Sequence, residues 1–563
     1  MIRRPAIVFF VILPVWLFAA SSRPLRAPHG LVTSSQRLAS EAGVEILKKG
    51  GNAIDAAVAT GFALAVVHPT AGNLGGGGFM VIRFADGKTT SFDYREKAPE
   101  RAHRDMYLKQ DGNVDEDKSQ IGYLAAGVPG SVAGLCLALQ KYGSLPLKTV
   151  MAPAIRLAEK GFDLSEDQAT SFSRHKQIFS RFPSSFKVFL KADGTTYQTG
   201  ERFRQPDLAR TLKAISRKGK DGFYTGRVAE LISADMAANG GLVTLQDLAD
   251  YRALERPPVH STFHDVDVIS MGPPSSGGVA LVEMLNMLEA KDLKSLGHNS
   301  SAYVHVLAEA MKRAFADRAE YLGDPDFVQV PVASLLSKGY ARSIFAAFDS
   351  VEATPAAAIK AGRATDWRES EQTTHYSTAD AQGMAVAVTT TLNGSYGSFA
   401  VVNGAGFLLN NEMDDFAAKP GSPNMYELIQ SEANAILPGK RMLSSMTPTI
   451  VTRNGQLFLV IGSPGGPTII NTVLQVVLNT VVFGMDIQEA IDAPRFHHQW
   501  YPDEIRYERD GLVKDVQLRL QTLGHKLAER SAIGEAEGIL FDQKRRLYWG
   551  AADGRGEGAA VGY

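Results

Sequence analysis

The chain has 563 residues, and 45% of them are hydrophobic, which is enough for a large core or for several domains. Its formal net charge is −1. Because there is no excess of basic residues to follow a phosphate backbone, we expect no nucleic acid among its partners.

The first 21 residues have the layout of a secretory signal peptide. A positively charged start, MIRRP, precedes the apolar run AIVFFVILPVWLFAA, and small residues follow at Ala19 to Ser22. The run is shorter than the roughly 20 residues of a membrane-spanning helix, and Pro14 interrupts it. We expect signal removal near residues 20–22, export to the periplasm or the medium, and no stable membrane span afterwards. An uncleaved anchor is the alternative.

The single cysteine, Cys136, cannot form an intramolecular disulfide. It lies in VAGLCLALQKYG, an apolar helical pattern that favours buried packing. An exported protein without a disulfide must rely on its core. This combination fits a protein of the bacterial periplasm.

Two helices are predicted first along the mature chain. Residues 34–51 have an amphipathic pattern with Ser35 as a candidate cap and two glycines at the end. Residues 53–69 are apolar on nearly all sides, so we expect a buried helix. A strand is predicted from GGGGFMVIRF, residues 75–84, and it pairs with TTSFDYRE, residues 89–96, as a hairpin.

Residues 127–348 are predicted to be mostly helical, and residues 351–371 resemble a linker, rich in Ala, Thr and charge. The character then changes. Strands are predicted from GMAVAVTTTL, GFLLN, TPTIVT and LFLVIGS, and an apolar helix from PTIINTVLQVVLNTVVFG. Because several of these strands are apolar at consecutive positions, both of their faces must be buried. This pattern indicates sheets stacked between layers of helices.

Threonines occur at both ends of one predicted hairpin. Thr373 and Thr374 open it directly after the linker-like stretch, and residues 389–391 close it. Threonine is common in strands because it is β-branched, and strand propensity alone could explain these residues. A threonine can also be a nucleophile if the chain is cut just before it, because its own α-amino group, with a pKa of roughly 7.7–8.0, can take the hydroxyl proton.

Several motifs around this hairpin resemble one known family. They are QTTHYS (372–377), VTTTLN (388–393), GFLLNNEMDDFAAKPG (406–421), RMLSSMTPTIV (441–451), GSPGGPTIINTVLQ (462–475), APRFHHQW (493–500) and GRGEGAAVGY (554–563), with LASEAGVEILKKGGNAIDAAVA, GGGGFM and DYREKAP in the N-terminal half. The family is the γ-glutamyltranspeptidases of the N-terminal nucleophile hydrolase superfamily. The resemblance covers nearly everything after the signal peptide. It implies an α+β fold, a four-layer αββα sandwich.

The resemblance also implies that the chain cuts itself. The cut would fall between Gln372 and Thr373, giving a large subunit of residues 22–372 and a small, catalytic subunit of residues 373–563. The two subunits would form a heterodimer that shares one αββα fold. Thr373 would be the nucleophile of both cleavage and catalysis. Thr391 matches the family threonine whose hydroxyl bonds to the nucleophile and helps to activate it.

SPGGPTII contains two glycines, Gly465 and Gly466, before a proline and a buried helix. Glycines there let backbone N–H groups point outward at the positive end of the helix, where an anion is stabilised. Simple helix capping would explain the same residues. The resemblance assigns the oxyanion hole to the two glycines.

The substrate residues also come from the resemblance. Positions matching Asn393, Glu412 and Asp415 hold the α-amino group of the substrate, although a solvated acidic loop would explain NNEMDDF equally well. Some family members have Gln where this chain has Glu412.

Arg95, Ser444 and Ser445 match the clamp on the α-carboxylate, and the planar fork of arginine donors suits that task. Taken alone, Arg95 would more often be a surface ion pair. KPGSPNMYELIQSEAN, residues 419–434, matches a loop that covers the pocket in many members, with Tyr426 at its aromatic gate.

Three other motifs are discounted. GGGGFM lacks the lysine of a phosphate-binding loop and precedes a strand. The histidines of HSTFH lie in strand-like sequence, and those of HHQW are adjacent, so neither pair converges on a metal ion. We therefore expect no metal and no cofactor.

Together these features predict a self-processing γ-glutamyltransferase and glutathione hydrolase. Its donors would be glutathione and other γ-glutamyl compounds, and its acceptors water, amino acids or peptides. Two alternatives are a glutaryl or cephalosporin acylase of the same fold and a binding protein that never processes.

Overall fold

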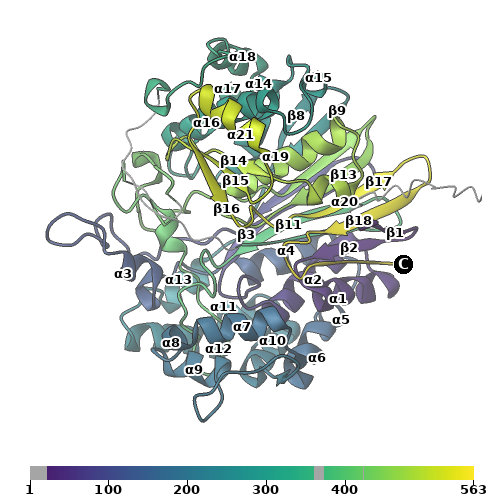
Figure 1. The fold of residues 1–563 in the computed structure, drawn as a ribbon. Helices are drawn as coiled ribbons and strands as arrows, with labels where there is room; N and C mark the ends of the chain where they lie inside the picture. Colours follow the sequence, from purple (N-terminus) through teal and green to yellow (C-terminus); the bar gives the residue numbers. More distant parts are fainter. Residues whose placement is uncertain (1–21, 361–372, 423, 426) are drawn as a thin grey trace, which may run out of the picture.

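The computed structural model describes residues 22–360, 373–422, 424–425 and 427–563. Two seven-stranded antiparallel sheets stack against each other between layers of helices (Figure 1). The predicted α+β, four-layer αββα fold is therefore confirmed.

We call the sheet that carries the threonine hairpin the first sheet. In spatial order its strands are β19 (Ala559–Gly562), β2 (Leu31–Ser34), β10 (Thr374–Ala379), β11 (Ala385–Thr391), β3 (Gly77–Arg83), β4 (Thr89–Asp93) and β7 (Leu254–Arg256). The second sheet has the order β1 (Leu25–Ala27), β18 (Leu547–Ala552), β17 (Glu537–Asp542), β13 (Gln456–Gly462), β12 (Thr449–Arg453), β9 (Val266–Ser270) and β8 (Val259–Phe263). Smaller sheets join β14 (Phe496–His497), β15 (Ile505–Glu508) and β16 (Leu527–Arg530), and β5 (Phe162–Asp163) with β6 (Arg202–Phe203).

Helices cover both outer faces. The first sheet is covered by α1 (Arg37–Lys48), α2 (Ala53–Val67) and α4 (Ser131–Tyr142), and the second by α14 (Gly277–Leu288), α19 (Thr468–Val481) and α20 (Ile487–Asp492). Two further helices pack outside these, α6 (Ala152–Lys160) on α2 and α16 (Ser301–Tyr321) on α14. The others are α3 (Glu116–Gln120), α5 (Leu147–Val150), α7 (Glu166–Arg174), α8 (Lys176–Phe179), α9 (Pro183–Phe189), α10 (Pro206–Lys218), α11 (Asp221–Tyr224), α12 (Gly226–Ala238), α13 (Leu245–Asp250), α15 (Leu293–Leu296), α17 (Val332–Leu335), α18 (Lys338–Phe345) and α21 (Lys514–Thr522).

Alternating side chains of β3 show how the layers are held. Phe79 and Val81 belong to the core that includes the space between the sheets, whereas Met80 and Ile82 pack into the core under α2. All 15 residues of α2 are buried, as its apolar sequence predicts. The central strands are covered on both faces because they carry apolar or small residues at successive positions.

Two local predictions are wrong. The cap of α1 is Gln36 and not Ser35, because the Ser35 hydroxyl accepts a hydrogen bond from Thr374 instead. GFLLN makes only isolated bridges, at Leu408 and Leu409, because the chain there turns back on itself through Gly406, whose φ is +79°. Residues 127–348 are helical for most of their length, but β8 and β9 leave the helices and complete the edge of the second sheet.

Strands from both sides of the expected cut alternate in both sheets. In the first sheet β10 and β11 lie between β2 and β3, and in the second β13 and β12 lie beside β9. The expected division at 372/373 would therefore leave two chains that share both sheets and the helices over the second sheet, whereas α1, α2 and α4 over the first sheet all precede the cut. Residues 1–21 and 361–372, with the expected signal peptide and Gln372, lie outside the described residues. Within the described residues, no helix is long and apolar enough to cross a membrane.

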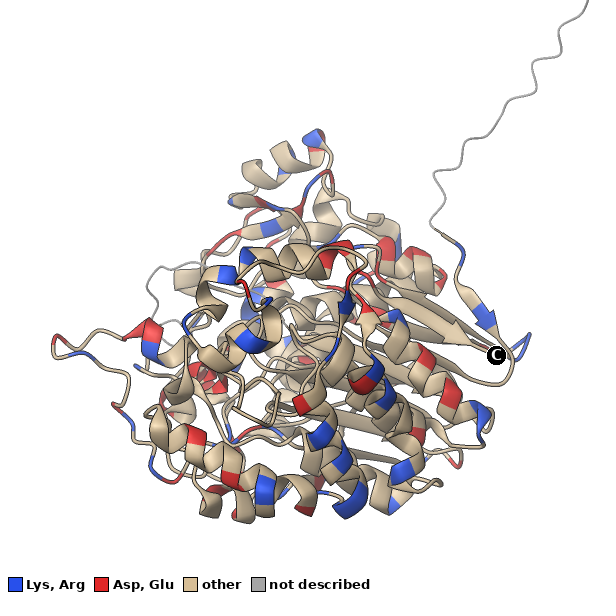
Figure 2. Cartoon of the chain, turned by 90° about the horizontal axis from the view of Figure 1, so that it is seen from below, with Lys and Arg blue, Asp and Glu red and all other residues tan. Residues whose placement is uncertain are grey.

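Basic and acidic residues are interspersed along the outer helices (Figure 2). This distribution matches the near-zero formal net charge of the chain.

Candidate active site

The threonine hairpin places Thr373 beside Thr391. β10 and β11 pair from Thr374 with Thr390 to Ala379 with Ala385, and one further step of this register sets Thr373 opposite Thr391. Both threonines are buried and line one pocket. The Thr391 hydroxyl accepts a hydrogen bond of 2.7 Å from Asn393 N. Within the described residues, no hydrogen bond joins the two threonine hydroxyls.

The pocket, of about 310 Å³ including space open to solvent, gathers residues from β11 of the first sheet, from α16 and α19, and from several loops. Its lining residues are Arg95, Arg318, Thr373, Thr391, Asn393, Asp415, Leu428, Leu443, Ser444, Ser445, Met446, Gly466 and Ile469. Eight of the residues expected at the site from the sequence are among them. Glu412 and Gly465 are not.

The two glycines of the SPGG motif form the turn before α19. Both have positive φ, +127° for Gly465 and +53° for Gly466, which favours glycine at each position. A Cβ on Gly465 would lie 2.3 Å from Thr468 Oγ1, so a side chain does not fit there. Gly466 lines the pocket at the N-terminal end of the helix, where the backbone stabilises negative charge.

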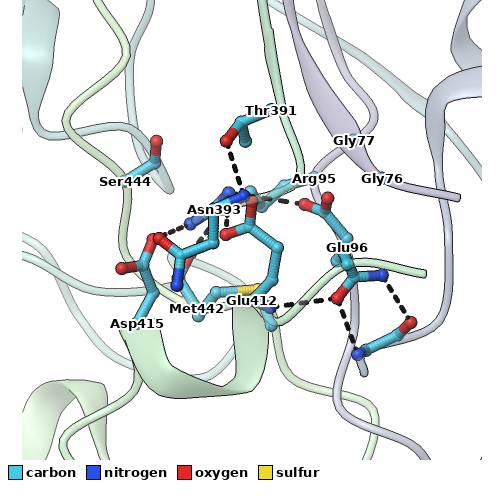
Figure 3. Close-up of polar contacts among 12 residues, drawn as sticks. Gly76, Gly77, Arg95, Glu96, Thr391, Asn393, Glu412, Asp415, Met442 and Ser444 are labelled. Atoms are coloured by element: carbon cyan, nitrogen blue, oxygen red, sulfur yellow. Dashed lines mark hydrogen bonds and ion pairs between the residues drawn. The ribbon is translucent and has the colours of Figure 1, made fainter. Parts of the chain in front are cut away.

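Arg95 lies at the centre of a cluster of three carboxylates (Figure 3). Its side chain is fully buried, and Nη1 lies 2.6 Å from Glu412 Oε2 and 3.4 Å from Glu96 Oε2. Nη2 forms an ion pair with Asp415. The guanidinium also donates to the backbone carbonyls of Met442 and Leu443, which fixes the loop that leads to Ser444.

The pKa values of Arg95 and its three carboxylate partners are set by burial and by the single guanidinium that the carboxylates share. Burial lowers the pKa of Arg95, but the carboxylates of Glu412 and Asp415 outweigh it and raise the value above its ordinary range. Burial raises the pKa of Glu96 to about 7, and Arg95 opposes this. Burial also raises the pKa of Glu412 well above its usual range. One guanidinium cannot neutralise three carboxylates, so protons are held within the cluster.

Glu412 is farther from the pocket than the sequence suggests. It has no exposed surface and lies behind Arg95, whereas Asp415 and Arg95 both reach the pocket. A ligand in the pocket therefore meets Asp415 directly and Glu412 through Arg95. Asn393 reaches the pocket with a left-handed backbone, φ +75°, and its Nδ2 donates to Asn411 O.

Arg318 is a pocket residue that sequence reasoning missed. It lies on α16, is buried, and donates from Nε to Ser276 Oγ at 2.9 Å and from Nη2 to Ser445 Oγ at 3.2 Å. Burial lowers its pKa to about 10. Its Nη1 is a buried donor without a hydrogen-bond partner among the described residues. No sequence signal marks it, because an arginine in a helix usually faces solvent.

The MGPPSSGG motif, residues 271–278, supports the serine loop. Ser276 donates to Ser444 O from its backbone N, at 2.8 Å, and from its hydroxyl, at 2.6 Å. Ser275 Oγ donates to Met446 O. The motif therefore fixes the backbone on both sides of Ser445.

The loop of residues 419–434 packs over these residues. Leu428 lines the pocket, and Met425 N donates to Asp414 Oδ2 at 3.2 Å. Asn424 Nδ2 lies 3.5 Å from Asp415 Oδ1. Tyr426, the expected aromatic gate, lies outside the described residues.

One buried cluster elsewhere has the residue types of a metal site. Within the described residues His305, Glu309 and His525 place ligand atoms within 4.8 Å of one another. These atoms are already paired, His305 Nδ1 with His525 Nε2 at 2.7 Å and Glu309 with Lys312 and Arg313. A cation here would have to displace two positive side chains, so the cluster fits a structural anchor better than a metal site.

Comparisons with known proteins give consistent matches along the whole chain. A family model described as Gamma-glutamyltranspeptidase matches residues 39–563. A glutathione hydrolase proenzyme of Escherichia coli strain K12 is 49% identical over 533 residues, covering 94% of this chain and 91% of that protein. A glutathione hydrolase proenzyme of Pseudomonas sp. strain A14 is 48% identical over 554 residues, covering 97% of this chain and 96% of that protein. The crystal structure of a cephalosporin acylase from Bacillus halodurans superposes with a TM-score of 0.86 at 28% identity and covers 99% of each chain.

Proposed function

The chain belongs to the gamma-glutamyltranspeptidase family, and we propose that it is a self-processing γ-glutamyltransferase and glutathione hydrolase with Thr373 as its nucleophile. The observation that carries the proposal is one pocket lined by Thr373, Thr391, Gly466, Arg95 and Asp415. It combines a hydroxyl nucleophile, a helix N-terminus and groups of both charges.

The processing step frees the base that catalysis needs. Cleavage between Gln372 and Thr373 leaves Thr373 with a free α-amino group, which takes the proton of its hydroxyl. The hydroxyl oxygen then attacks the γ-carbonyl carbon of the substrate. The negative oxygen that forms is stabilised by backbone N–H groups at Gly465 and Gly466, where losing one donor typically costs about 3–4 kcal/mol.

The remaining steps release two products. The C–N bond breaks, and the leaving amine takes the proton held by the Thr373 ammonium. This leaves a γ-glutamyl-threonine ester. Water then attacks the ester and gives glutamate, or the amine of an amino acid or peptide attacks and takes the γ-glutamyl group. Thr391 orients the Thr373 hydroxyl in both halves of the reaction. None of these steps uses a metal ion or a cofactor.

The charged groups at the other end of the pocket suit the head of a γ-glutamyl group. Arg95, Ser444 and Ser445 bind the α-carboxylate, with Arg318 behind Ser445. Asp415 and Asn393 bind the α-ammonium, and Glu412 supports them from behind Arg95. Tyr426 completes the proposed site from the covering loop. A free amino acid head group satisfies both sets of charges.

The subunits and the location complete the proposal. Residues 22–372 and 373–563 stay together as a heterodimer after cleavage, because strands from both alternate in both sheets. Residues 1–21 direct export of the precursor to the periplasm or the medium.

A second candidate is an acylase for glutaryl or cephalosporin side chains. The structural likeness to a cephalosporin acylase favours it. The position of Asp415 in the pocket opposes it, because a glutaryl chain has no ammonium to bind this carboxylate, which would face the ligand with only its ion pair to Arg95. The two glutathione hydrolase proenzymes are also much closer in sequence.

Two anilide substrates separate the candidates. A γ-glutamyl anilide and a glutaryl anilide differ only in the α-amino group. We expect kcat/KM to be at least about 30-fold higher for the γ-glutamyl substrate, since losing one partner of a buried charged contact costs about 2–5 kcal/mol. Equal values for both substrates would favour the acylase, and no turnover of either by fully cleaved protein would contradict both.

A further inference from the structure

The glycine-rich segment GNLGGGGFM, residues 72–80, is not explained by the chemistry above. It lies at the start of β3, which pairs with β11 so that Gly77 is opposite Thr391. The segment therefore lies beside the residue that is proposed to orient the nucleophile, and Ser131 at the start of α4 contacts it through Asn73.

Asn73 holds the backbone of Thr391. Its Nδ2 donates to Thr391 O at 2.8 Å, to Ala71 O at 2.9 Å and to Thr390 Oγ1 at 3.3 Å. Its Oδ1 accepts from Gly76 N at 3.0 Å and from Ser131 Oγ at 2.6 Å. The side chain is only 6% exposed. All of its donors and acceptors are used, so its position is fixed by three separate segments.

The glycines allow this close approach. A Cβ on Gly76 would lie 2.0 Å from Thr391 O, and one on Gly78 would lie 2.5 Å from Thr389 O. Any side chain at Gly76 would therefore push the Thr391 carbonyl away from Asn73. The run of glycines is explained by packing of one backbone against another.

We propose that Asn73 is a positioning residue for Thr391, and that residues 73–78 form a support that sets the peptide after Thr391. The inference rests on the proposed function, in which Thr391 orients Thr373. Thr391 is the last residue of β11, so beyond it the strand no longer fixes the peptide plane. Asn73 fixes this plane through the carbonyl, while Asn393 N, two residues on, binds the Thr391 hydroxyl.

This arrangement predicts a selective kinetic effect. A loosened carbonyl would rotate the peptide after Thr391 and move its hydroxyl relative to Thr373. A misplacement of about 1 Å can cost roughly 10²-fold in rate. Of the residues proposed to bind the head group, Arg95 comes from the turn after β4 and Ser444 from the loop before β12, and only Asn393 belongs to the segment of Thr391. The KM for the donor should therefore change little.

Two variants test the support. Asn73→Asp has the same size but cannot donate to Thr391 O, and Ser131→Ala removes one donor to Asn73 and leaves the amide in place. We expect kcat for a γ-glutamyl anilide to fall at least 10-fold in Asn73→Asp and about 3-fold in Ser131→Ala, with KM within 3-fold of the wild type. Self-cleavage of the two precursors should also slow, and it should slow more in Asn73→Asp than in Ser131→Ala.

Asn286→Asp is the matched control. Asn286 is a buried amide on α14 that donates to Leu336 O at 2.9 Å, away from the pocket. Its substitution should change thermal stability and not kcat. If Asn73→Asp yields no folded protein, the kcat of Ser131→Ala decides the test. The inference would be overturned if the kcat of Asn73→Asp, or of Ser131→Ala in that case, equals the kcat of Asn286→Asp.

A double-mutant cycle separates positioning from general structural damage. In a Thr391→Ala background the Asn73→Asp substitution should lower kcat no further, because the hydroxyl that it positions is absent. If the two substitutions instead lower kcat by factors that multiply, Asn73 acts by a route other than the Thr391 hydroxyl, and the inference would be overturned. A wild-type protein that neither cleaves itself nor turns over the anilide would contradict the proposed function instead.

Discussion

Replacing Thr373 by alanine removes one hydroxyl from the pocket and leaves the backbone unchanged. We expect Thr373→Ala to abolish both self-cleavage and turnover, because no other group can form the ester. Gel analysis of the purified precursor and an anilide assay measure the two effects. Substantial cleavage in this variant would remove Thr373 from the nucleophile role.

The next residue supplies the control. The Thr374 hydroxyl points the other way and donates to Ser35 Oγ at 3.0 Å. Thr374→Ala should keep cleavage and turnover within about 10-fold of the wild type, since it loses one neutral hydrogen bond, worth about 1 kcal/mol.

We expect Arg95 to have a stability role in addition to its proposed binding role. Removing it would leave Glu412, Asp415 and Glu96 buried without their cation. We expect Arg95→Ala to lower the free energy of unfolding by about 3–5 kcal/mol, the usual cost of breaking a buried pair. Arg104→Ala breaks the exposed pair with Glu432 and should cost about 0–1 kcal/mol in the same denaturant titration. Equal losses in the two variants would contradict a buried, compensating role for Arg95.

Local motifs in the sequence named eight residues that the structure brings to one pocket. The residue types of QTTHYS and SPGG also fit strand propensity and helix capping, so the proposed roles as nucleophile and anion site come from the resemblance to the family. Arg318 and Asn73 give no such signal, because the partners that connect them to the site, Ser445 and Thr391, lie more than 100 residues away in the chain. The position of Glu412 behind Arg95 was also not predictable, since the sequence does not show which of two neighbouring carboxylates reaches the pocket.

An ion pair joins the loop of residues 419–434 to β15. Glu427, in left-handed backbone with φ +59°, pairs with Arg506, and both side chains are buried. Glu427→Gln keeps the size and removes the charge. We expect the loop to detach more readily, so that limited proteolysis within residues 419–434 becomes several-fold faster and the KM for the donor rises.

A neighbouring exposed pair gives the comparison. Arg509 lies 3.5 Å from Glu529 at the surface. Glu529→Gln should leave both the proteolysis rate and the KM unchanged. The same cleavage rate in Glu427→Gln as in Glu529→Gln would show that the pair with Arg506 does not hold the loop.

Among the elements, long segments with one clear pattern were predictable. α2 and β11 follow from apolar runs of the right length. GFLLN has the composition of a strand, but tertiary contacts on both sides of the hairpin at Gly406 leave it only single bridges. The strand-like HSTFH segment coincides with β8, whereas β9 was not predicted within the mostly helical region. Strand pairing across more than 100 residues, such as β9 with β12, leaves no local signal.

At the scale of the whole molecule, His375 connects the two sheets. Its Nδ1 pairs with Thr389 Oγ1 at 2.9 Å and its Nε2 with Ser377 Oγ at 3.0 Å, and Ser377 Oγ donates to Glu537 O on β17. Burial lowers the pKa of His375 to about 3. The ring is therefore neutral wherever the fold is intact.

This pKa gives a stability change with a defined sign. An unfolded histidine binds a proton below about pH 6.5, whereas His375 in the folded state does so only near pH 3. The contribution of the neutral, buried His375 to the free energy of unfolding is complete above pH 6.5. This contribution is lost as the pH falls from 6.5 towards 3. Between pH 7.5 and 5 we expect the stability difference between wild type and His375→Gln to shrink by about 2 kcal/mol.

Chemical denaturation of the processed protein at the two pH values measures this difference. A difference that does not change with pH would mean that His375 is protonated equally in the folded and unfolded states, contrary to its burial between the sheets.

The most direct test is the intact mass and the N-terminal sequence of the purified wild-type protein after incubation alone at neutral pH. Self-processing at the proposed bond predicts two fragments that stay associated, and the smaller one begins Thr373, Thr374, His375. A single chain that is intact across residues 372 and 373 would leave Thr373 without its amine and would contradict the proposed mechanism.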